Sequence, residues 1–389
     1  MKQKVFFILI SVILTGCQKT IKSGELVEID ISKSYPKKEI HLQDVADIEY
    51  IPLETTDDIL LGQISIISYI SDNYIVVYDY MQAKVFVFNR DGTIASHFSH
   101  KGQGDKEYSY IMDLVFDEKN EEIFVMDNPS THRIQVYSLN GEFIRSLKYA
   151  DDLRISVFNF DDETLLVYDE NGLMQNEYRE VPYMFMSKKD GSIVSELDIR
   201  LSVRYASSKM MSVEVNGQTG IAPFNIRLSN NRFYGRDFVI ADMSSDTIYR
   251  LTKTKELTPM LVRTPSVHSS DPRTVWVVEL VTDRFIFISK ATLDFELVRK
   301  TQQVSMLSFC HEFETGEISD MKFVNDDYPS GRDYTNAIDT PSKNVAVGLI
   351  QLPTLKSAYE EKKLKGELEK LVATLDEEDN PVVMIVKFK

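Results

Sequence analysis

The sequence predicts an all-β protein, a six-bladed β-propeller, and three observations carry this prediction. A strand–turn–strand pattern ends in an Asp-Gly or Asn-Gly turn at Gly92, Gly141 and Gly191, at intervals of 49 and 50 residues. That period is typical of arrays of small four-stranded sheets, which bury their faces by stacking around an axis. Six such units use every segment of the chain. Alternating segments at both ends lack a sheet of their own, so we expect N- and C-terminal strands to close the last blade.

The N-terminal segment reads as a targeting signal. A basic start is followed by an apolar run from Val5 to Leu14, which is too short to cross a bilayer but suits a signal-peptide core. Leu-Thr-Gly-Cys at 14–17 resembles a bacterial lipobox, which implies cleavage before Cys17 and lipidation of this residue. We therefore predict a lipoprotein signal peptide over residues 1–16, with an ordinary secretory peptide as the alternative. The polar residues 17–38 predict a tether between the lipid and the fold.

The first three blades follow directly from the repeat, and the later blades are less regular. A fourth blade contains Phe238 to Asp242 and is stretched by an insertion over Val203 to Gly220, in which Asn216-Gly217 predicts a hairpin. A fifth spans about Thr274 to Lys322. The predicted bounds of the first three blades are about Ile64 to Phe98, Tyr110 to Leu147, and Leu153 to Leu197.

The two ends of the domain are expected to meet. Ile40 to Leu53 contains an alternating segment, and Val382 to Phe388 is an apolar strand without neighbours in the sequence. Pairing them would remove the two free edges of an open ring. Leucines at helical spacing between Leu355 and Leu375 predict one C-terminal helix inserted before the final strand. The propeller is thus predicted to cover residues 39–389.

Composition limits the partners and the sources of stability. The formal net charge of -16 argues against a nucleic-acid partner, because phosphate backbones are bound through clustered Lys and Arg. After cleavage before Cys17, Cys310 is one of the two remaining cysteines, the other being the lipidated one. No intramolecular disulfide is therefore expected, and packing must stabilise the fold.

The chain resembles a known family, the six-bladed β-propeller lipoproteins of Bacteroidetes, which are relatives of the NHL-repeat propellers. The resemblance rests on YIPLETT, GQGDKEY, SSDTIYRL, FETGEI and DNPVVMIVKFK, and it extends over nearly the whole mature length. Asp105 and Lys106 stand where the family's usual Gly-Pro-Gly-Glu-Tyr loop has Pro-Gly. The resemblance implies the fold and a place in the cell envelope, and it implies little about activity.

The sequence contains no recognisable catalytic motif. The six histidines include no pair at ligand spacing on one element, and neither H-E-x-x-H nor G-x-S-x-G occurs. Four aspartates end the second strands and could ring a channel that binds Ca²⁺; equally, they are ordinary turn residues. These aspartates are Asp79, Asp127, Asp169 and Asp242. We predict neither catalytic residues nor a cofactor, and Ca²⁺ remains the alternative.

Loop residues supply the predicted ligand contacts. Tyrosine at a loop tip offers flat apolar area and a hydroxyl, which suits contact with a sugar or a peptide, although packing at a blade edge is the alternative. In a propeller the loops after second strands and the crossovers between blades share one face, and we expect binding there. The opposite face, with its Asp-Gly hairpins, is expected to offer few side chains for a pocket. The predicted contact residues are Tyr80, Tyr108, Tyr110, Asn128, His132 and Arg133.

These observations predict a membrane-anchored cell-envelope lipoprotein whose propeller binds a glycan, peptide or protein. A hydrolase, lactonase or lyase with a divalent metal in the channel is the alternative, and a purely structural scaffold is a third reading. Surface-exported lipoproteins of these bacteria typically carry acidic residues directly after the lipidated cysteine. In this chain Gln18-Lys19-Thr20 follows the cysteine and contains no acidic residue. We therefore expect an outer-membrane lipoprotein that faces the periplasm, with surface exposure as the alternative.

Overall fold

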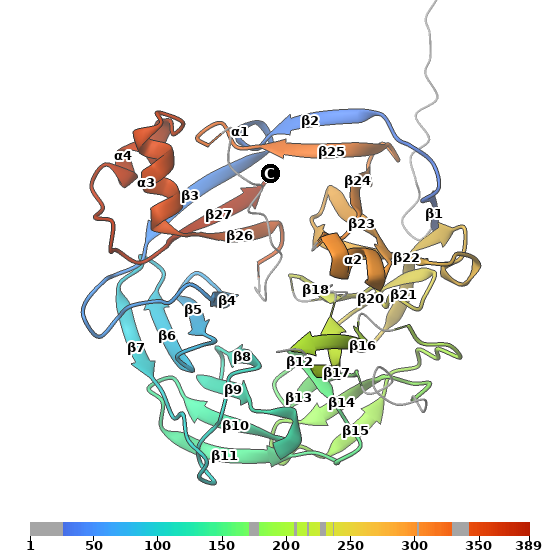
Figure 1. The fold of residues 1–389 in the computed structure, drawn as a ribbon, viewed down its shortest axis with the longest axis horizontal. Coiled ribbons are helices and arrows are strands. Elements are labelled where there is room, and N and C mark those ends of the chain that lie inside the picture. Colours follow the sequence, from blue (N-terminus) through green and yellow to red (C-terminus); the bar gives the residue numbers. More distant parts are fainter. Residues whose placement is uncertain are drawn as a thin grey trace, which may run out of the picture.

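Six sheets are arranged in a ring, which confirms the predicted six-bladed propeller (Figure 1). The computed structural model describes residues 26–170, 179–205, 208–215, 218–225, 231–235, 237–301, 303–328 and 342–389. The predicted signal peptide, Cys17 and the start of the tether lie outside these residues.

The first three blades are four-stranded antiparallel meanders at the places that the repeat predicts. Their second and third strands are rich in apolar and β-branched residues, which favour extended backbone, and they are buried on both faces. The first blade is β4 (Ser65–Ile70), β5 (Tyr74–Asp79), β6 (Lys84–Asn89) and β7 (Ile94–Phe98); the second is β8 (Asp113–Asp117), β9 (Glu122–Met126), β10 (Arg133–Ser138) and β11 (Phe143–Lys148); the third is β12 (Ile155–Asn159), β13 (Thr164–Asp169), β14 (Tyr183–Ser187) and β15 (Ile193–Glu196).

The fourth and fifth blades each gain a fifth strand from the N-terminal segment. The fourth comprises β18 (Asn231–Tyr234), β19 (Asp237–Ile240), β20 (Thr247–Leu251) and β21 (Leu257–Thr264), with β1 (Val27–Asp30) parallel to β21. The fifth comprises β22 (Arg273–Val281), β23 (Phe285–Leu293), β24 (Met306–Glu312) and β25 (Ile318–Val324), with β2 (Lys37–His41) parallel to β25. The prediction of a tether up to residue 38 is corrected here, because the edges of β21 and β25 offer backbone partners that the sequence of this polar segment does not reveal.

The predicted closure is confirmed. The sixth blade contains β26 (Val345–Ile350), β27 (Val382–Phe388) and β3 (Ala46–Pro52), which follows the short helix α1 (Leu42–Val45). β27 pairs antiparallel with both of its neighbours, from Val382 opposite Pro52 to Phe388 opposite Ala46. The two ends of the chain are therefore joined within one sheet.

Two short helices replace the single C-terminal helix that the leucine spacing predicts. They are α3 (Leu352–Glu360) and α4 (Gly366–Val372). Lys362, between the two helices, and Gly366, the first residue of α4, have φ angles of 55° and 60°, which a continuous helix does not allow. The Lys365 amide also donates to the Asp327 carbonyl at 2.8 Å, so a tertiary contact holds the break.

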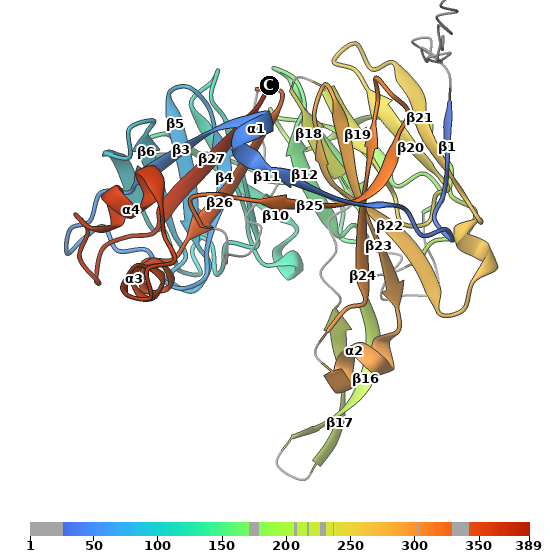
Figure 2. The ribbon, with the colours of Figure 1, turned by 90° about the horizontal axis from the view of Figure 1, so that it is seen from above.

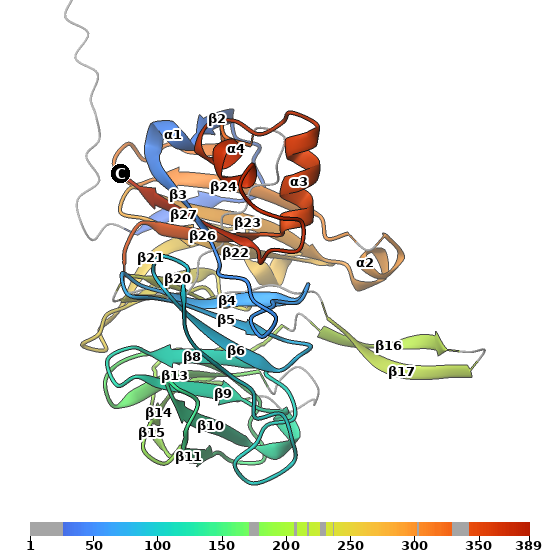
Figure 3. The ribbon, with the colours of Figure 1, turned by 90° about the vertical axis from the view of Figure 1, so that its left-hand side faces the viewer.

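A hairpin projects from the ring at the predicted insertion. It consists of β16 (Ser208–Val215) and β17 (Gln218–Asn225), which pair antiparallel with each other (Figure 2). We call this hairpin the arm. Figure 3 also shows it standing clear of the blades, on the same side as α2 (Phe295–Thr301). The predicted turn at Asn216-Gly217 itself lies outside the described residues.

The blades are held together by apolar side chains between adjacent sheets. Between the first two blades, the fully buried Phe116 forms T-shaped contacts with Tyr69 and Tyr74, with ring centroids 5.1 and 6.0 Å away. The ring has two faces. We call the face with the turns between first and second strands, and between third and fourth strands, the hairpin face. The other face, with the loops after second strands and the crossovers between blades, is the crossover face.

Candidate functional site

The prediction that Tyr108 contacts a ligand is corrected, because its side chain is fully buried. Its hydroxyl donates to the Ala83 carbonyl at 3.1 Å and accepts from the His100 amide at 3.1 Å. Its ring meets Tyr137 edge-on at 5.8 Å. The loop that carries Tyr108 folds back between the first two blades, so this tyrosine joins their core instead of a surface.

The other predicted residues near Tyr108 organise loops of the crossover face. Arg133 forms an ion pair with the buried Asp127 at 3.1 Å and donates to the Glu107 carbonyl at 2.9 Å. Asn128 accepts from the Ser130 amide at 3.0 Å and so caps a single 3-10 turn, Pro129–Thr131. His132 follows with a left-handed φ of 46°. The contacts of Arg133 and Asn128 give these two side chains a structural task.

Most of the aspartates at the ends of the second strands are held by backbone amides of nearby loops. Asp79 accepts from the amides of Gly62 at 2.6 Å and Gln82 at 2.8 Å, and Asp127 accepts from the Ser109 amide at 2.8 Å. These bonds are those of turn residues. Within the part of the chain that the structure describes, no group of three or more His, Cys, Asp or Glu side chains is arranged to hold a metal ion.

An exposed apolar rim lies on the crossover face at the first two blades. Tyr80 is half-buried there and Tyr110 is 47% exposed. β4 and β8 lie side by side, and the Ser68 hydroxyl donates to the Leu114 carbonyl. Because both strands start at this face, their first residues are brought together. The exposed apolar side chains of this rim, besides Tyr110, are Leu60, Ile64, Ile66, Met81 and Met112.

Polar groups with perturbed acidity lie beside this rim. Burial raises the pKa of Asp113 to about 6, and the nearby charge of Glu170 adds to the effect. Burial also raises the pKa of Glu170, against a hydrogen bond that the Ser156 hydroxyl donates to it. Arg204 is 8% exposed, and its Nε and Nη1 find no partner among the described residues.

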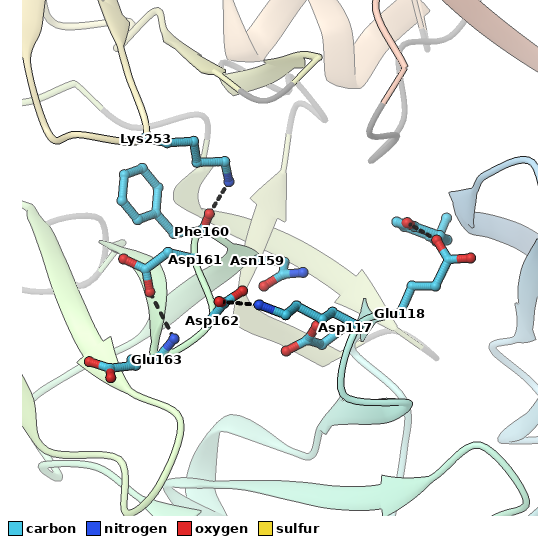
Figure 4. Close-up of a pocket in the computed structure, with 10 residues that line it drawn as sticks. Asp117, Glu118, Asn159, Phe160, Asp161, Asp162, Glu163 and Lys253 are labelled. Atoms are coloured by element: carbon cyan, nitrogen blue, oxygen red, sulfur yellow. Dashed lines mark hydrogen bonds and ion pairs between the residues drawn. The ribbon is translucent and has the colours of Figure 1, made fainter.

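The hairpin face contains a pocket of about 920 Å³, contrary to the expectation that this face offers few side chains (Figure 4). The prediction considered only the Asp-Gly turns between third and fourth strands. The pocket is built mainly by the turns between first and second strands of the second and third blades. Its lining residues are Tyr69, Asp117, Glu118, Lys119, Asn159, Phe160, Asp161, Asp162, Glu163 and Lys253.

A buried ion pair ties the two acidic turns of the pocket together. Lys188, from the turn after β14, lies 2.6 Å from the carboxylate of Asp117, and both side chains are 5% exposed. The same ammonium donates to the Asp161 carbonyl at 2.5 Å. One lysine of the third blade therefore positions both turns, and a pair with such burial needs both members because a lone buried charge is costly.

The remaining carboxylates of the pocket differ in the hydrogen bonds that they accept from the protein. Burial alone would raise the pKa of Asp161, but hydrogen bonds from Glu163 and Thr164 outweigh it and lower the pKa. Glu118 accepts from Tyr69 at 2.7 Å and from Asn73 at 2.8 Å. The Glu163 carboxylate is exposed and has no hydrogen-bond or ion-pair partner among the described residues.

The lining carries five carboxylates against two lysines, so the pocket attracts positive charge and accepts hydrogen bonds. Sequence reasoning missed it. The signal was present in the acidic runs DEKN at 117–120 and DDE at 161–163. These runs are 44 residues apart, and no local pattern shows that Lys188 brings them together.

A family model described as Domain of unknown function (DUF4934) matches residues 26–387. The chain belongs to this family. The match begins one residue before β1 and ends within β27, so the DUF4934 domain covers the whole ring, including the two strands added by the N-terminal segment. None of the curated proteins matches the sequence.

Three solved structures are similar to this DUF4934 chain to different degrees, all at low sequence identity. A Bacteroides fragilis NCTC 9343 protein, named as an exported protein, has a TM-score of 0.62 and 14% identity over 94% of this chain and 100% of its own. A DUF4221 member from Bacteroides vulgatus ATCC 8482 has a TM-score of 0.45 and 9% identity, over 89% and 97% of the two chains. Virginiamycin B lyase from Staphylococcus aureus reaches 0.33 at 10% identity, over 70% and 98%. Of these three likenesses, that to the Bacteroides fragilis protein shows a shared fold, and at 14% identity it shows the fold alone.

Proposed function

We propose that this protein is an exported lipoprotein whose propeller binds a polar, positively charged glycan or peptide in the hairpin-face pocket. The observation that carries the proposal is the pocket of about 920 Å³ whose lining holds five carboxylates and two lysines. A cavity of this size fits a small ligand. Carboxylates accept hydrogen bonds from hydroxyl and ammonium groups, and Glu163 is available for this.

An array of neutral, amine-bearing and acidic oligosaccharides, together with basic and acidic peptides, tests the pocket. We expect basic or amine-bearing members to bind, with affinity that falls as salt increases. The double variant Asp162→Asn with Glu163→Gln should bind them several-fold more weakly. Glu142→Gln removes an exposed carboxylate on the same face, outside the pocket, and serves as the matched control. Preference for acidic members, or equal loss in the control, would contradict the proposal.

Membrane anchoring is the second part of the proposal. The lipobox-like sequence at 14–17 supports lipidation of Cys17, and the similar Bacteroides fragilis protein is named as exported. Among the described residues, no helix has the length and apolarity needed to cross a bilayer. We expect Cys17→Ala to leave the precursor uncleaved and without lipid label, whereas processing of the variant and membrane retention would refute anchoring at this residue. Protease treatment of intact cells distinguishes a periplasm-facing from a surface-exposed protein.

An enzymatic function is the second candidate, and the pair Asp113 and Glu170 favours it. A carboxyl whose pKa is raised to about 6 can exchange protons near neutral pH, as acid–base catalysis requires. A panel of chromogenic glycosides and esters at several pH values tests this candidate. We expect any turnover to depend on a group with a pKa near 6 and to disappear in Asp113→Asn. Turnover that survives this substitution, or no turnover of any member, counts against catalysis at this pair.

A further inference from the structure

The arm is the one described sheet that takes no part in the ring. β16 and β17 pair with each other alone in the described part of the chain, whereas the other strands belong to the six blades. Figures 2 and 3 show the arm standing away from the blades. An isolated two-stranded ribbon is marginally stable in water, and its outer edges expose backbone groups that seek a strand.

The register identifies which backbone groups point outward. Two residues separate Val215 from Gln218, so these two form a hydrogen-bonded pair, and the pairs then alternate along the ribbon. In β16 the outward groups include those of Ser212. In β17 they belong to Thr219, Ile221 and Pro223, and Pro223 has no N–H to offer.

The two edges of the arm differ in their cover. Arg299 of α2 donates to the outward carbonyl of Ser212 at 3.0 Å, so α2 occupies the edge of β16. No described residue pairs with the outer edge of β17. The open edge therefore begins at Thr219 and ends where Pro223 interrupts the donors. It is long enough to pair with a short strand.

The position of the arm directs this edge away from the start of the domain. In Figure 2 the Val27 end of β1 and the arm lie on opposite sides of the ring. If Cys17 is lipidated, the nine residues from 18 to 26 span at most ~30 Å. The membrane then lies on the side of β1, and the arm points away from it.

We propose that the outer edge of β17 is a docking site for an extended, basic segment of a partner protein, which adds a third strand to the arm. The free backbone groups of Thr219 and Ile221 define the strand conformation of the occupant. The arm and α2 have no excess of acidic residues, so the preference for a basic partner comes from the net charge of -16 of the whole chain, which also disfavours a second copy of the same chain.

A displayed library of nine-residue peptides, alternating in apolar residues and flanked by Lys, tests the site with the mature chain. We expect selected peptides to protect the Thr219 and Ile221 amides from hydrogen exchange. Ile221→Pro removes an outward donor without touching the pairing with β16, and it should weaken binding at least tenfold. Ile221→Val retains the backbone donor and should bind as the unchanged chain does.

Three outcomes would overturn the proposal. They are selection of no peptide, selected peptides that bind Ile221→Pro equally well, and a concentration-dependent dimer that disappears when residues 208–225 are replaced by a Gly-Ser linker. The last outcome would make a second copy the occupant. Binding of amine-bearing ligands at the hairpin-face pocket is measured separately, so this test and the test of the proposed function fail independently.

Discussion

At the scale of single residues, Tyr108 and Tyr110 show how two nearby tyrosines differ in role. Tyr108 is fully buried between the first two blades, and Tyr110 is 47% exposed on the crossover rim. We expect Tyr108→Ala to lower the free energy of unfolding by about 3 to 5 kcal/mol, as for other large-to-small changes of aromatic core residues. Tyr108→Phe should cost about 1 kcal/mol, because it leaves the His100 amide without its acceptor, whereas the Ala83 carbonyl keeps the Ser99 hydroxyl as a donor.

Urea unfolding of these variants checks the assignment, with Tyr110→Ala as the control. Because Tyr110 is largely in solvent, its truncation should change the free energy of unfolding by less than about 0.5 kcal/mol. If Tyr108→Ala unfolds at the same urea concentration as the unchanged chain, Tyr108 is not a core residue.

We expect the buried side chain of His311 to make the free energy of unfolding depend on pH. Its ring is 1% exposed, neither nitrogen has a partner among the described residues, and it meets Phe313 edge-on at 5.5 Å. Burial lowers the pKa of His311, against the charge of Glu312. Histidine in the unfolded chain has a pKa of about 6.5, so as the pH falls below this value the unfolded chain binds a proton more readily than the folded protein does.

Stability contributed by neutral His311 is therefore complete above about pH 6.5 and decreases as the pH falls below it, by up to about 1.4 kcal/mol per pH unit. Unfolding by urea at pH 7.5, 6.5 and 5.5 measures this. His311→Leu should remove this part of the dependence. Equal slopes for the two proteins would show that His311 takes up its proton freely in the fold.

At the scale of elements, the Asp-Gly turn of the first blade joins the repeat to the closing strand. Gly92 has a φ of +91°, and a Cβ at this position would lie 2.2 Å from the Pro52 carbonyl oxygen, at the end of β3. The Glu54 amide donates to the Gly92 carbonyl at 2.9 Å. The turn that the sequence pattern identifies is thus also a contact between the first and sixth blades.

We expect Gly92→Ala to destabilise the protein by more than the ~1 to 2 kcal/mol that a left-handed conformation costs, because the added methyl also meets backbone. Thermal unfolding measures the loss. Gly220→Ala is the matched control, since a Cβ there has nothing within 4 Å. A Gly92→Ala variant that melts with the control would mean that the turn rearranges without cost.

At the scale of the whole molecule, β27 closes the ring. It lies between β26 and β3, and Val382, Val383, Ile385 and Val386 are buried. Removing residues 382–389 would leave two strands without partners and open the core between blades. The loss should exceed the ~5 to 15 kcal/mol by which domains are stable, so we expect no cooperative thermal transition.

Replacement of the arm, residues 208–225, by a Gly-Ser linker provides the comparison for this truncation. The arm pairs with no blade, so its removal should leave the melting temperature of the ring nearly unchanged. Circular dichroism melting of both variants distinguishes an element inside the closed ring from one outside it. A truncated chain that melts like the arm-less one would disprove closure by β27.

The sequence by itself determined the local units and their number. The recurring turns at Gly92, Gly141 and Gly191 set the first three blades, because an alternating strand and a tight turn are encoded by neighbouring residues. The pairing of the two ends could also be predicted, since unsatisfied strand edges leave few alternatives. Polar segments such as β1 and β2 gave no such signal, because their pairing depends on edges supplied by distant strands.

Only the tertiary structure decided which side chains are buried and where a pocket forms. Tyr108 looked like a loop residue, and the packing of two blades buried it. The two acidic turns of the pocket lie far apart in the sequence, and the ammonium of Lys188 brings them together. Periodicity is a property of neighbouring residues and can be recognised in one chain, whereas a pocket is formed by side chains from several sheets whose relative placement only the closed ring determines.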